Sequence, residues 1–161
     1  LDDGRNRPTA ALTAWMRLHS LIERPRPRRF DSVNILLAYD GSDPAEAALD
    51  LAVAQFDPDH LTALYVFDPD GAASDDPEEP ARERADEILP AVRERVGDRV
   101  EVETVHAVGD PTDEVVAYAE TNDIDHVVLG SHGRRGMSRL LVGSVAEAVV
   151  RGSPVPVTVV R

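Results

Sequence analysis

The sequence predicts an α/β fold, in which a five-stranded parallel sheet is covered by helices on both faces. Five short runs of mainly Val, Ile, Leu and Ala have the near-continuous apolar character of strands buried on both faces. Segments with helical spacing of apolar residues alternate with these runs, and such alternation gives parallel strands with right-handed crossovers. For five strands the doubly wound order 3-2-1-4-5 is the natural arrangement, and 161 residues suit one domain of this kind.

The first strand and the first helix are expected on either side of a short turn. Residues 33–39 form a near-continuous apolar strand, and Asp40-Gly41-Ser42 closes it. The next helix has Asp43 as its expected N-cap and Pro44 at its first position, since aspartate can accept from free backbone N–H groups and proline lacks an N–H. This order of strand, turn and helix is that of a βαβ unit.

The second and third strands are expected over residues 61–67 and 100–108. Between them, residues 68–80 are too polar to pack and should form a surface loop, and residues 81–96 have the apolar spacing of a helix. Pro90 lies inside this helix and predicts a kink or a break. The third strand alternates apolar residues with glutamate in its first half, which is typical of an edge strand with one face in water.

The last two strands complete the alternation. Asp110 and Pro111 repeat the helix-start signal, and the short apolar run 126–129 follows that helix as the fourth strand. The fifth strand is expected over Val155–Val160, where Pro156 places it at an edge of the sheet. This apolar edge would be unusually bare, so we expect it to pair with the same strand of a second copy in a homodimer.

A glycine-rich segment connects the fourth strand to the last helix. Gly130 and Gly133 would let backbone N–H groups approach an anion, and Gly143 and Ser144 would place further N–H groups at the positive start of a helix. Glu147 follows Ser144 by three residues, so a capping box is an alternative reason for this serine. The P-loop and dinucleotide fingerprints do not fit, because the chain contains no lysine and the glycines come late in the sequence.

The predicted topology brings this segment close to the first turn. In a sheet of order 3-2-1-4-5, the crevice for a ligand lies beside the carboxyl ends of the first and fourth strands. Asp40 ends the first of these strands and Gly130 ends the fourth. We therefore expect both residues at one ligand site, although Asp40 could also serve only to cap Ser42 in the turn.

The spacing of the glycines resembles a known family signature. Gly130, Gly133 and Gly143-Ser144 are separated by two and nine residues, as in the G-2x-G-9x-G-[S/T] signature of ATP-binding universal stress proteins. The resemblance covers about residues 34–161 and implies an adenine nucleotide alpha hydrolase-like fold. Four further segments carry it: Ile35-Leu36-Leu37-Ala38-Tyr39-Asp40-Gly41-Ser42, Leu64-Tyr65-Val66, Gly109-Asp110-Pro111 and Ser153-Pro154-Val155-Pro156-Val157.

The resemblance also implies a nucleotide site. The carboxylate of Asp40 and the backbone near Val66 would hold adenine, and the ribose and phosphates would run past the glycines. The expected ligand is ATP, with AMP or ADP as alternatives, and with Mg²⁺ or Mn²⁺ on the phosphates. Arg134 and its neighbour Arg135 could contact a triphosphate or remain solvated. The residues expected at the ligand are Ala38, Tyr39, Asp40, Val66, Leu129, Gly130, His132, Gly133, Arg134, Gly143, Ser144 and Val145.

These features favour a binding protein over a fast enzyme. No base is obviously placed to orient water at a γ-phosphate, and the histidines lack metal-ligand spacing, so we expect no catalytic residue and no metal site built by the protein alone. The expected function is that of a cytoplasmic, ATP-binding, homodimeric protein of the stress response. A slow ATP hydrolase or phosphotransferase and a nucleotide-free interaction module are the alternatives. Valine at Gly130 or Gly133 is expected to abolish ATP binding and to leave the fold nearly intact.

The distribution of charge separates an N-terminal segment from the rest of the chain. Residues 1–30 hold seven Arg against three acids, a net charge of +4, whereas residues 31–161 hold ten Arg against 27 acids, a net charge of −17. We expect a basic extension over residues 1–30, helical or disordered, before a universal stress protein domain over residues 31–161. The acidic body argues against nucleic-acid binding and is typical of a salt-adapted, halophilic organism, with a surface for a basic partner as the alternative. No apolar run approaches the roughly 20 residues of a membrane span.

Overall fold

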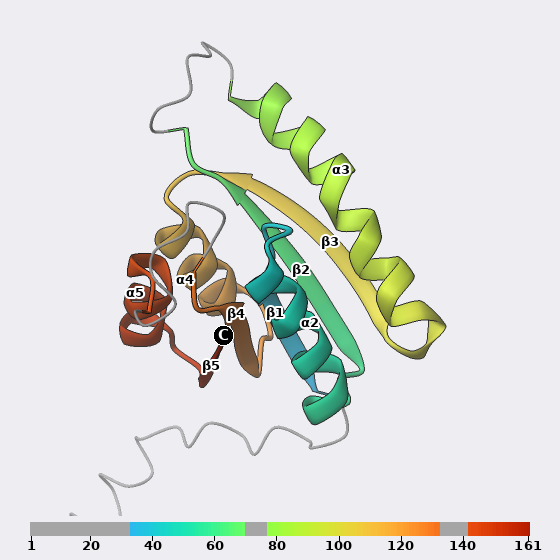
Figure 1. Ribbon diagram of the computed structural model, residues 1–161. Coiled ribbons are helices and arrows are strands. Elements are labelled where there is room, and N and C mark those ends of the chain that lie inside the picture. The colour runs from blue at the N-terminus through green and yellow to red at the C-terminus, as the bar shows by residue number, and fades with distance from the viewer. Residues whose placement is uncertain (1–32, 70–76, 133–141) are drawn as a thin grey trace, which may run out of the picture. The chain divides into compact units, whose positions relative to one another are not determined.

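The structure, a computed structural model, describes residues 33–69, 77–132 and 142–161 (Figure 1). The expectations for residues 1–30, and for Gly133 and Arg134, lie outside these ranges. The described elements are, in chain order, β1 (Asn34–Ala38), α2 (Asp43–Phe56), β2 (His60–Phe67), α3 (Glu78–Val96), η1 (Gly97–Arg99), β3 (Glu101–Val108), α4 (Pro111–Thr121), β4 (His126–Gly130), α5 (Ser144–Gly152) and β5 (Val157–Val160).

The sheet has the order β3-β2-β1-β4-β5 with all neighbouring strands parallel, which confirms the predicted topology. β3 and β5 are its edge strands, as the alternating glutamates and Pro156 indicated. β5 begins at Val157, two residues later than expected. At the centre of the sheet, Ala38 of β1 is in register with Leu64 of β2 and with Leu129 of β4, so the carboxyl ends of these three strands lie level with one another.

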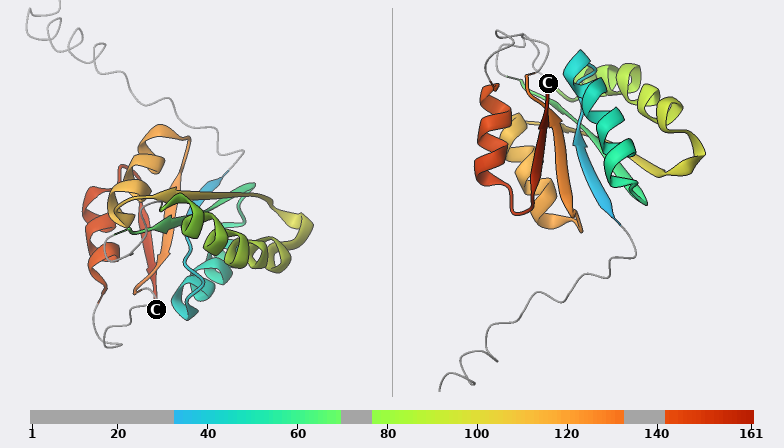
Figure 2. Two further views of the ribbon diagram at one scale, coloured as in Figure 1. Left: turned by 90° about the horizontal axis from the view of Figure 1, so that it is seen from above. Right: turned by 60° about the horizontal axis from the view of Figure 1, so that its bottom comes forward.

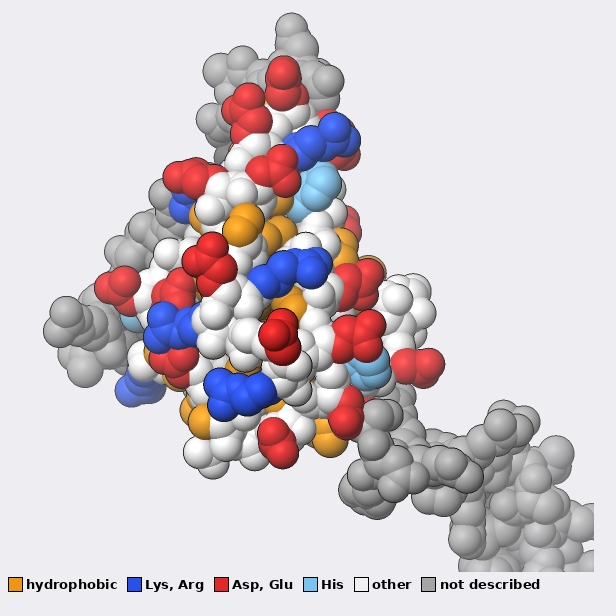
Figure 3. Space-filling view, turned by 90° about the vertical axis from the view of Figure 1, so that its right-hand side faces the viewer, with side chains coloured by type: hydrophobic (Ala, Val, Ile, Leu, Met, Phe, Trp, Pro, Cys, Tyr) orange, Lys and Arg blue, Asp and Glu red, His pale blue; other side chains and the backbone are white. Residues whose placement is uncertain are grey.

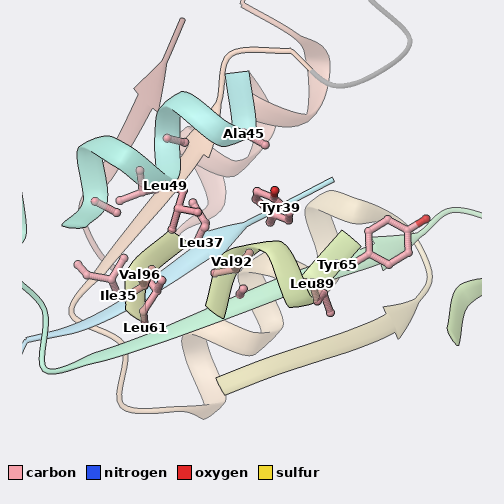
Figure 4. Packing of buried hydrophobic residues seen from close by; sticks show 14 of the residues in the cluster. Ile35, Leu37, Tyr39, Ala45, Leu49, Leu61, Tyr65, Leu89, Val92 and Val96 are labelled. Atoms are coloured by element: carbon pink, nitrogen blue, oxygen red, sulfur yellow. The ribbon is translucent and has the colours of Figure 1, made fainter. Parts of the chain in front are cut away.

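Helices cover both faces of the sheet. α2 and α3 lie on one face, and α4 and α5 lie on the other (Figure 2). Each face has its own cluster of buried apolar side chains. Between the sheet, α2 and α3, side chains such as Leu37, Leu49 and Val92 are completely buried and lie close together (Figure 4). Burying a side chain of this size contributes about 1.5–3 kcal/mol to folding, so the two clusters hold the helices on the sheet.

A kink or a break is expected at Pro90; α3 runs through this residue as one helix, so the break does not occur. Proline in a helix leaves the carbonyl four residues earlier without its usual donor. Pro90 and Asp86 are both exposed, so water can hydrogen-bond to that carbonyl. The opposite side of the helix packs on the sheet, where Ala81, Ala85, Ile88, Leu89, Val92 and Val96 are buried.

The start of α2 is capped one residue earlier than expected. Ser42 rather than Asp43 is the N-cap, and its hydroxyl oxygen accepts from the amide of Ala45 (3.4 Å). Ser42 has the extended backbone of an N-cap, which leaves Asp43 as the first helical residue. The start of α4 is as expected, because the Asp110 carboxylate accepts from two backbone N–H groups of the first turn (2.8 and 3.1 Å).

The beginning of α2 lies in direct contact with the end of β4. A β-carbon on Gly130 would lie 2.8 Å from Cβ of Pro44, 2.9 Å from the carbonyl carbon of Pro44 and 3.1 Å from the amide nitrogen of Ala45. Two of these neighbours are backbone atoms, which cannot rotate out of the way. Gly130 is therefore required by the packing of α2 on the sheet, and the expectation that valine at this position would leave the fold nearly intact is wrong.

The substitution Gly130→Ala should lower the free energy of unfolding by about 1–3 kcal/mol, because α2 must move away from the added methyl group. Urea denaturation followed by circular dichroism measures this change. Gly152→Ala is the matched control, since a β-carbon there meets only Cγ2 of Val116 at 3.4 Å. If Gly130→Ala were as stable as the wild type, α2 would not approach β4 as closely as the structure has it.

His126 joins β4 to β5 and to α2. Its Nε2 lies 2.8 Å from Oγ1 of Thr158, and its ring centroid lies 4.5 Å from that of Phe56 at the end of α2. Burial lowers the pKa of His126 below the usual value for histidine. The folded protein therefore resists protonation of this ring, whereas the unfolded chain takes up the proton at the ordinary pKa.

The wild-type protein should accordingly lose the contribution of His126 to stability as the pH falls below about 6.5, the ordinary pKa of histidine. His126→Phe keeps an aromatic ring beside Phe56 but cannot titrate. Lowering the pH from about 7.5 to about 5.5 should therefore destabilise the wild type more than the variant. Urea denaturation at both pH values gives the two differences in unfolding free energy, and equal differences would contradict the lowered pKa.

Candidate functional site

The carboxyl edge of the sheet brings together the ends of β1, β2 and β4. Because Ala38 is in register with Leu64, Asp40 and Val66 each lie two residues further along neighbouring strands. The amide of Tyr39 donates to the carbonyl of Leu64 (2.9 Å), which extends the ladder beyond the last residue of β1. Asp40 therefore follows β1 at the same edge at which Gly130 ends β4, as the predicted topology required.

The Asp40 carboxylate organises the turn that follows β1. Its Oδ1 accepts from the amide (3.0 Å) and from the hydroxyl (2.6 Å) of Ser42. Since the hydroxyl proton of Ser42 points to Asp40, the Ser42 oxygen keeps a lone pair with which it accepts from Ala45. The turn-cap interpretation of Asp40 is thus realised in the structure. It also fixes the direction of the carboxylate at the sheet edge.

A polar network behind this turn ties β1 to α2 and α3. The hydroxyl of Tyr39 donates to Glu46, whose other carboxylate oxygen pairs with Arg95 (3.1 Å). Arg95 in turn makes a bidentate pair with Asp50, with two distances of 2.6 Å. Burial raises the pKa of Tyr39 above its usual range, and the hydrogen bond to Glu46 raises it further, so the phenol stays a donor. The side chain of Tyr39 lies in the core rather than at the edge (Figure 4).

The predicted apolar contacts lie just below the edge. Leu129 is 3% exposed and belongs to the cluster under α4 and α5, and the half-buried Ala38 and Val66 pack against the same cluster. These three side chains form an apolar floor at the ends of the central strands. The sequence placed all three at the expected ligand, and the register explains why they occur together.

Past β4, the chain turns around a buried serine. Ser131 is 1% exposed, and its amide donates to the carbonyl of Val160 on β5 (2.6 Å). Its own carbonyl accepts from the amide of Gly143 (2.6 Å), which returns the chain to the end of β4. Its hydroxyl lies 2.9 Å from Nδ1 of His132. No sequence pattern points to this role, because a serine that is buried in a glycine-rich segment has the same sequence context as an exposed loop serine.

The N-cap residue of α5 supplies no side-chain cap. The N-cap of this helix is Gly143, which has no side chain, and Ser144 is the first helical residue, so the capping box expected with Glu147 is not formed. Ser144 is exposed, and Val145 beside it is 36% exposed. A β-carbon on Gly143 would lie only 3.0 Å from the carbonyl oxygen of Ser131, so glycine allows the helix to begin this close to β4. The first-turn N–H groups of α5 have no acceptor within the helix.

The remaining described surface carries charged side chains and a groove, which lies away from the carboxyl edge of the sheet. Acidic side chains with arginines between them cover the face presented by α3 and β3 (Figure 3). A groove of about 560 Å³ lies at the amino ends of β1, β2 and β3, where Nδ1 of His60 pairs with Glu101 (3.0 Å). None of the predicted site residues lines this groove. Within the described ranges, no three histidine, aspartate or glutamate side chains are arranged to hold a metal ion.

Comparison with known proteins identifies the fold and the family. Residues 33–161 match the Universal stress protein family. Universal stress protein MJ0531 of Methanocaldococcus jannaschii is 32% identical over 139 residues, which cover 79% of this chain and 81% of the relative. Universal stress protein YxiE of Bacillus subtilis is 30% identical over 145 residues, covering 79% of this chain and 97% of the relative.

Solved structures of universal stress proteins have the same fold as this chain. Universal stress protein UspA from Lactobacillus plantarum matches with a TM-score of 0.67 and 33% identity, and the match covers 81% of this chain and 98% of the UspA chain. A universal stress protein in complex with cAMP shares the fold, with a TM-score of 0.58 at 24% identity over 81% of this chain and 97% of its own. An Arabidopsis thaliana family member with AMP bound also shares it, with a TM-score of 0.56 at 17% identity over 80% of this chain and 90% of its own.

Among the described helices, none is both long enough and apolar enough to cross a membrane. The family match spans residues 33–161, and two universal stress proteins share at least 30% of the aligned residues with this chain. The chain therefore belongs to the universal stress protein family.

Proposed function

We propose that this stress protein binds an adenine nucleotide, ATP in particular, at the carboxyl edge between β1 and β4, and that it acts in the cytoplasm by binding rather than by rapid turnover. One observation carries the proposal. The start of α5, whose N-cap is the glycine Gly143, is tied to the end of β4 through the Gly143 amide and the Ser131 carbonyl, at the same edge as Asp40. A helix start without a side-chain cap suits an anion, because its N–H groups and its dipole both favour negative charge.

The proposed roles follow from where each residue lies. The Asp40 carboxylate, fixed by Ser42, would accept from a hydroxyl or amine of the adenosine part, and the backbone near Val66 would border the base. The N–H groups at the start of α5 and the hydroxyl of Ser144 would hold the phosphates. Gly133 and Arg134 belong to the proposal through the family signature, and a bound Mg²⁺ or Mn²⁺ would offset the charge of the phosphates.

The fold itself is compatible with such a ligand. Two solved structures that share it contain cAMP and AMP. Their identities of 24% and 17% establish the fold alone, and a shared fold does not carry a function with it. The proposal for this chain therefore depends on its own Asp40 turn and on the start of its own α5.

Adding a carboxylate at the start of α5 tests the site directly. Ser144→Asp should stabilise the helix by about 0.3–1 kcal/mol, because a negative charge suits the helix dipole. The same charge should weaken ATP binding by at least about tenfold, since like charges near a protein surface repel by about 4 kcal/mol at 4 Å. Thermal unfolding and calorimetric titration with Mg-ATP measure the two effects, which have opposite signs.

Ser144→Asn is the control for that experiment, because asparagine has the size of aspartate without its charge. It should bind ATP more tightly than Ser144→Asp. If all three proteins bound ATP equally, the start of α5 would not hold the phosphates. Phosphate release at more than about one turnover per minute would favour the alternative of an ATP hydrolase, whereas a wild type that binds no nucleotide would favour an interaction module.

We further propose that β5 pairs with the β5 of a second copy. The support is its place at the sheet edge and the partial exposure of every residue from Val157 to Val160. An edge of this kind otherwise presents unpaired backbone groups beside apolar side chains. Light scattering during size-exclusion chromatography should give twice the chain mass of 17.5 kDa. A single species at the mass of one chain would contradict the pairing.

A further inference from the structure

Arg84 of α3 lies against the turn that carries Asp40. A β-carbon on Gly41 would lie 3.6 Å from a terminal guanidinium nitrogen of Arg84 and 3.3 Å from Cγ2 of Ile88. Gly41 has a φ of +75°, in the left-handed region that favours glycine. The absence of a side chain at Gly41 therefore lets α3 approach the turn closely, and it leaves the most mobile residue type at the centre of the turn.

The position of Arg84 is unusual for a charged residue. Its side chain is only 22% exposed, and its guanidinium pairs with Glu87 one turn later in the helix. In the described part of the chain, Nε of Arg84 is buried and has no hydrogen-bond partner. Arginines are mostly exposed, and an unpaired buried donor costs free energy. The residues with which α3 packs on the sheet are apolar, and Arg84 is not one of them. The ion pair with Glu87 thus accounts for one end of the guanidinium, and Nε is left without a structural role.

We infer that Arg84 is a positioning residue of the nucleotide site, and this inference rests on the proposed function. A terminal nitrogen of its guanidinium lies beside Gly41, and its bulk on the α3 side of the turn restricts the movement of Gly41. Its positive charge also attracts the Asp40 carboxylate and so helps to fix the direction in which that carboxylate points. Arg84 acts through Asp40 on the adenosine part of the ligand and does not contact the phosphates.

Arg84→Met tests this role. Methionine keeps an unbranched stem that can pack on Ile88, and it removes both the charge and the unpaired Nε. The variant should unfold at the same or a higher urea concentration than the wild type. Its affinity for adenosine, AMP and Mg-ATP, measured by calorimetric titration, should fall by the same factor of about ten for all three ligands. Arg84→Lys, which restores the charge without the planar shape, should recover part of this loss.

Two comparisons complete the experiment. Arg82→Met removes an exposed arginine from the same turn of α3 and should leave the three affinities unchanged. The double variant Arg84→Met with Asp40→Asn should bind no more weakly than Asp40→Asn alone, because a positioning residue has no effect once the group that it positions is lost. A loss that adds fully to that of Asp40→Asn would overturn the inference.

The outcomes separate this inference from the proposed function. If the wild type binds none of the three ligands, the proposed function fails, and the inference fails with it. If the wild type binds them and Arg84→Met binds them equally well, only the inference is overturned. A loss of affinity that grows from adenosine to ATP would also overturn it, because Arg84 would then contact the phosphates. A lower unfolding midpoint with unchanged affinity would assign Arg84 to stability alone.

Discussion

The contact between the start of α2 and the end of β4 is the constraint on which the carboxyl edge depends. Gly130 has no side chain, so Pro44 and Ala45 can pack directly on the strand. The pairing of β1 with β4 places the turn after β1 where the order of the sheet reverses, and this contact holds the start of α2 there. On the other side of β4, Gly143 starts α5 against the carbonyl of Ser131. Both glycines thus have a packing role in the protein, and a ligand at this edge would bind to backbone that this packing already holds in place.

The turn after β1 is held from several directions. Asp40 and Ser42 bond to each other, and Tyr39 is fixed through Glu46 to the far end of α3. A site that is already ordered loses less conformational entropy when a ligand binds. The start of α5 contrasts with this turn, because its N-cap has no side chain and Ser144 is exposed. One wall of the proposed site is therefore fixed by side chains, and the other offers backbone N–H groups.

Because the protein is strongly acidic, binding of an anion depends on the groups that lie directly at the proposed site. Residues 31–161 carry a net charge of −17 and the whole chain carries −13, so an anionic ligand is repelled by the molecule as a whole. Binding of phosphates in such a body needs positive potential close to the ligand, where screening by salt acts least. The start of a helix supplies this potential without adding a charged side chain. That is a physical reason to look for the phosphates at α5 rather than on the acidic face of α3 and β3.

The sequence alone determined the elements, their order in the sheet and the strand ends that meet. Apolar runs and helical spacing are local patterns, and the handedness of crossovers converts them into one topology, which is why Asp40 and Gly130 could be assigned to a common edge. The N-cap residues of α2 and α5 were harder to predict from the sequence. Ser42 rather than Asp43 is the N-cap of α2, and Gly143 rather than Ser144 is the N-cap of α5, because Asp40 and Ser131 accept hydrogen bonds from the amides of these two residues and so hold them extended.

Only the tertiary structure decided what the glycines and the charged residues do. The need for glycine at position 130 comes from the backbone of Pro44, which lies far away in the sequence. The place of Arg84 over Gly41 and the link from Tyr39 to Arg95 likewise join segments separated by about forty to sixty residues. Such contacts depend on distances between packed elements, and a pattern of residue types along the chain carries no information about those distances.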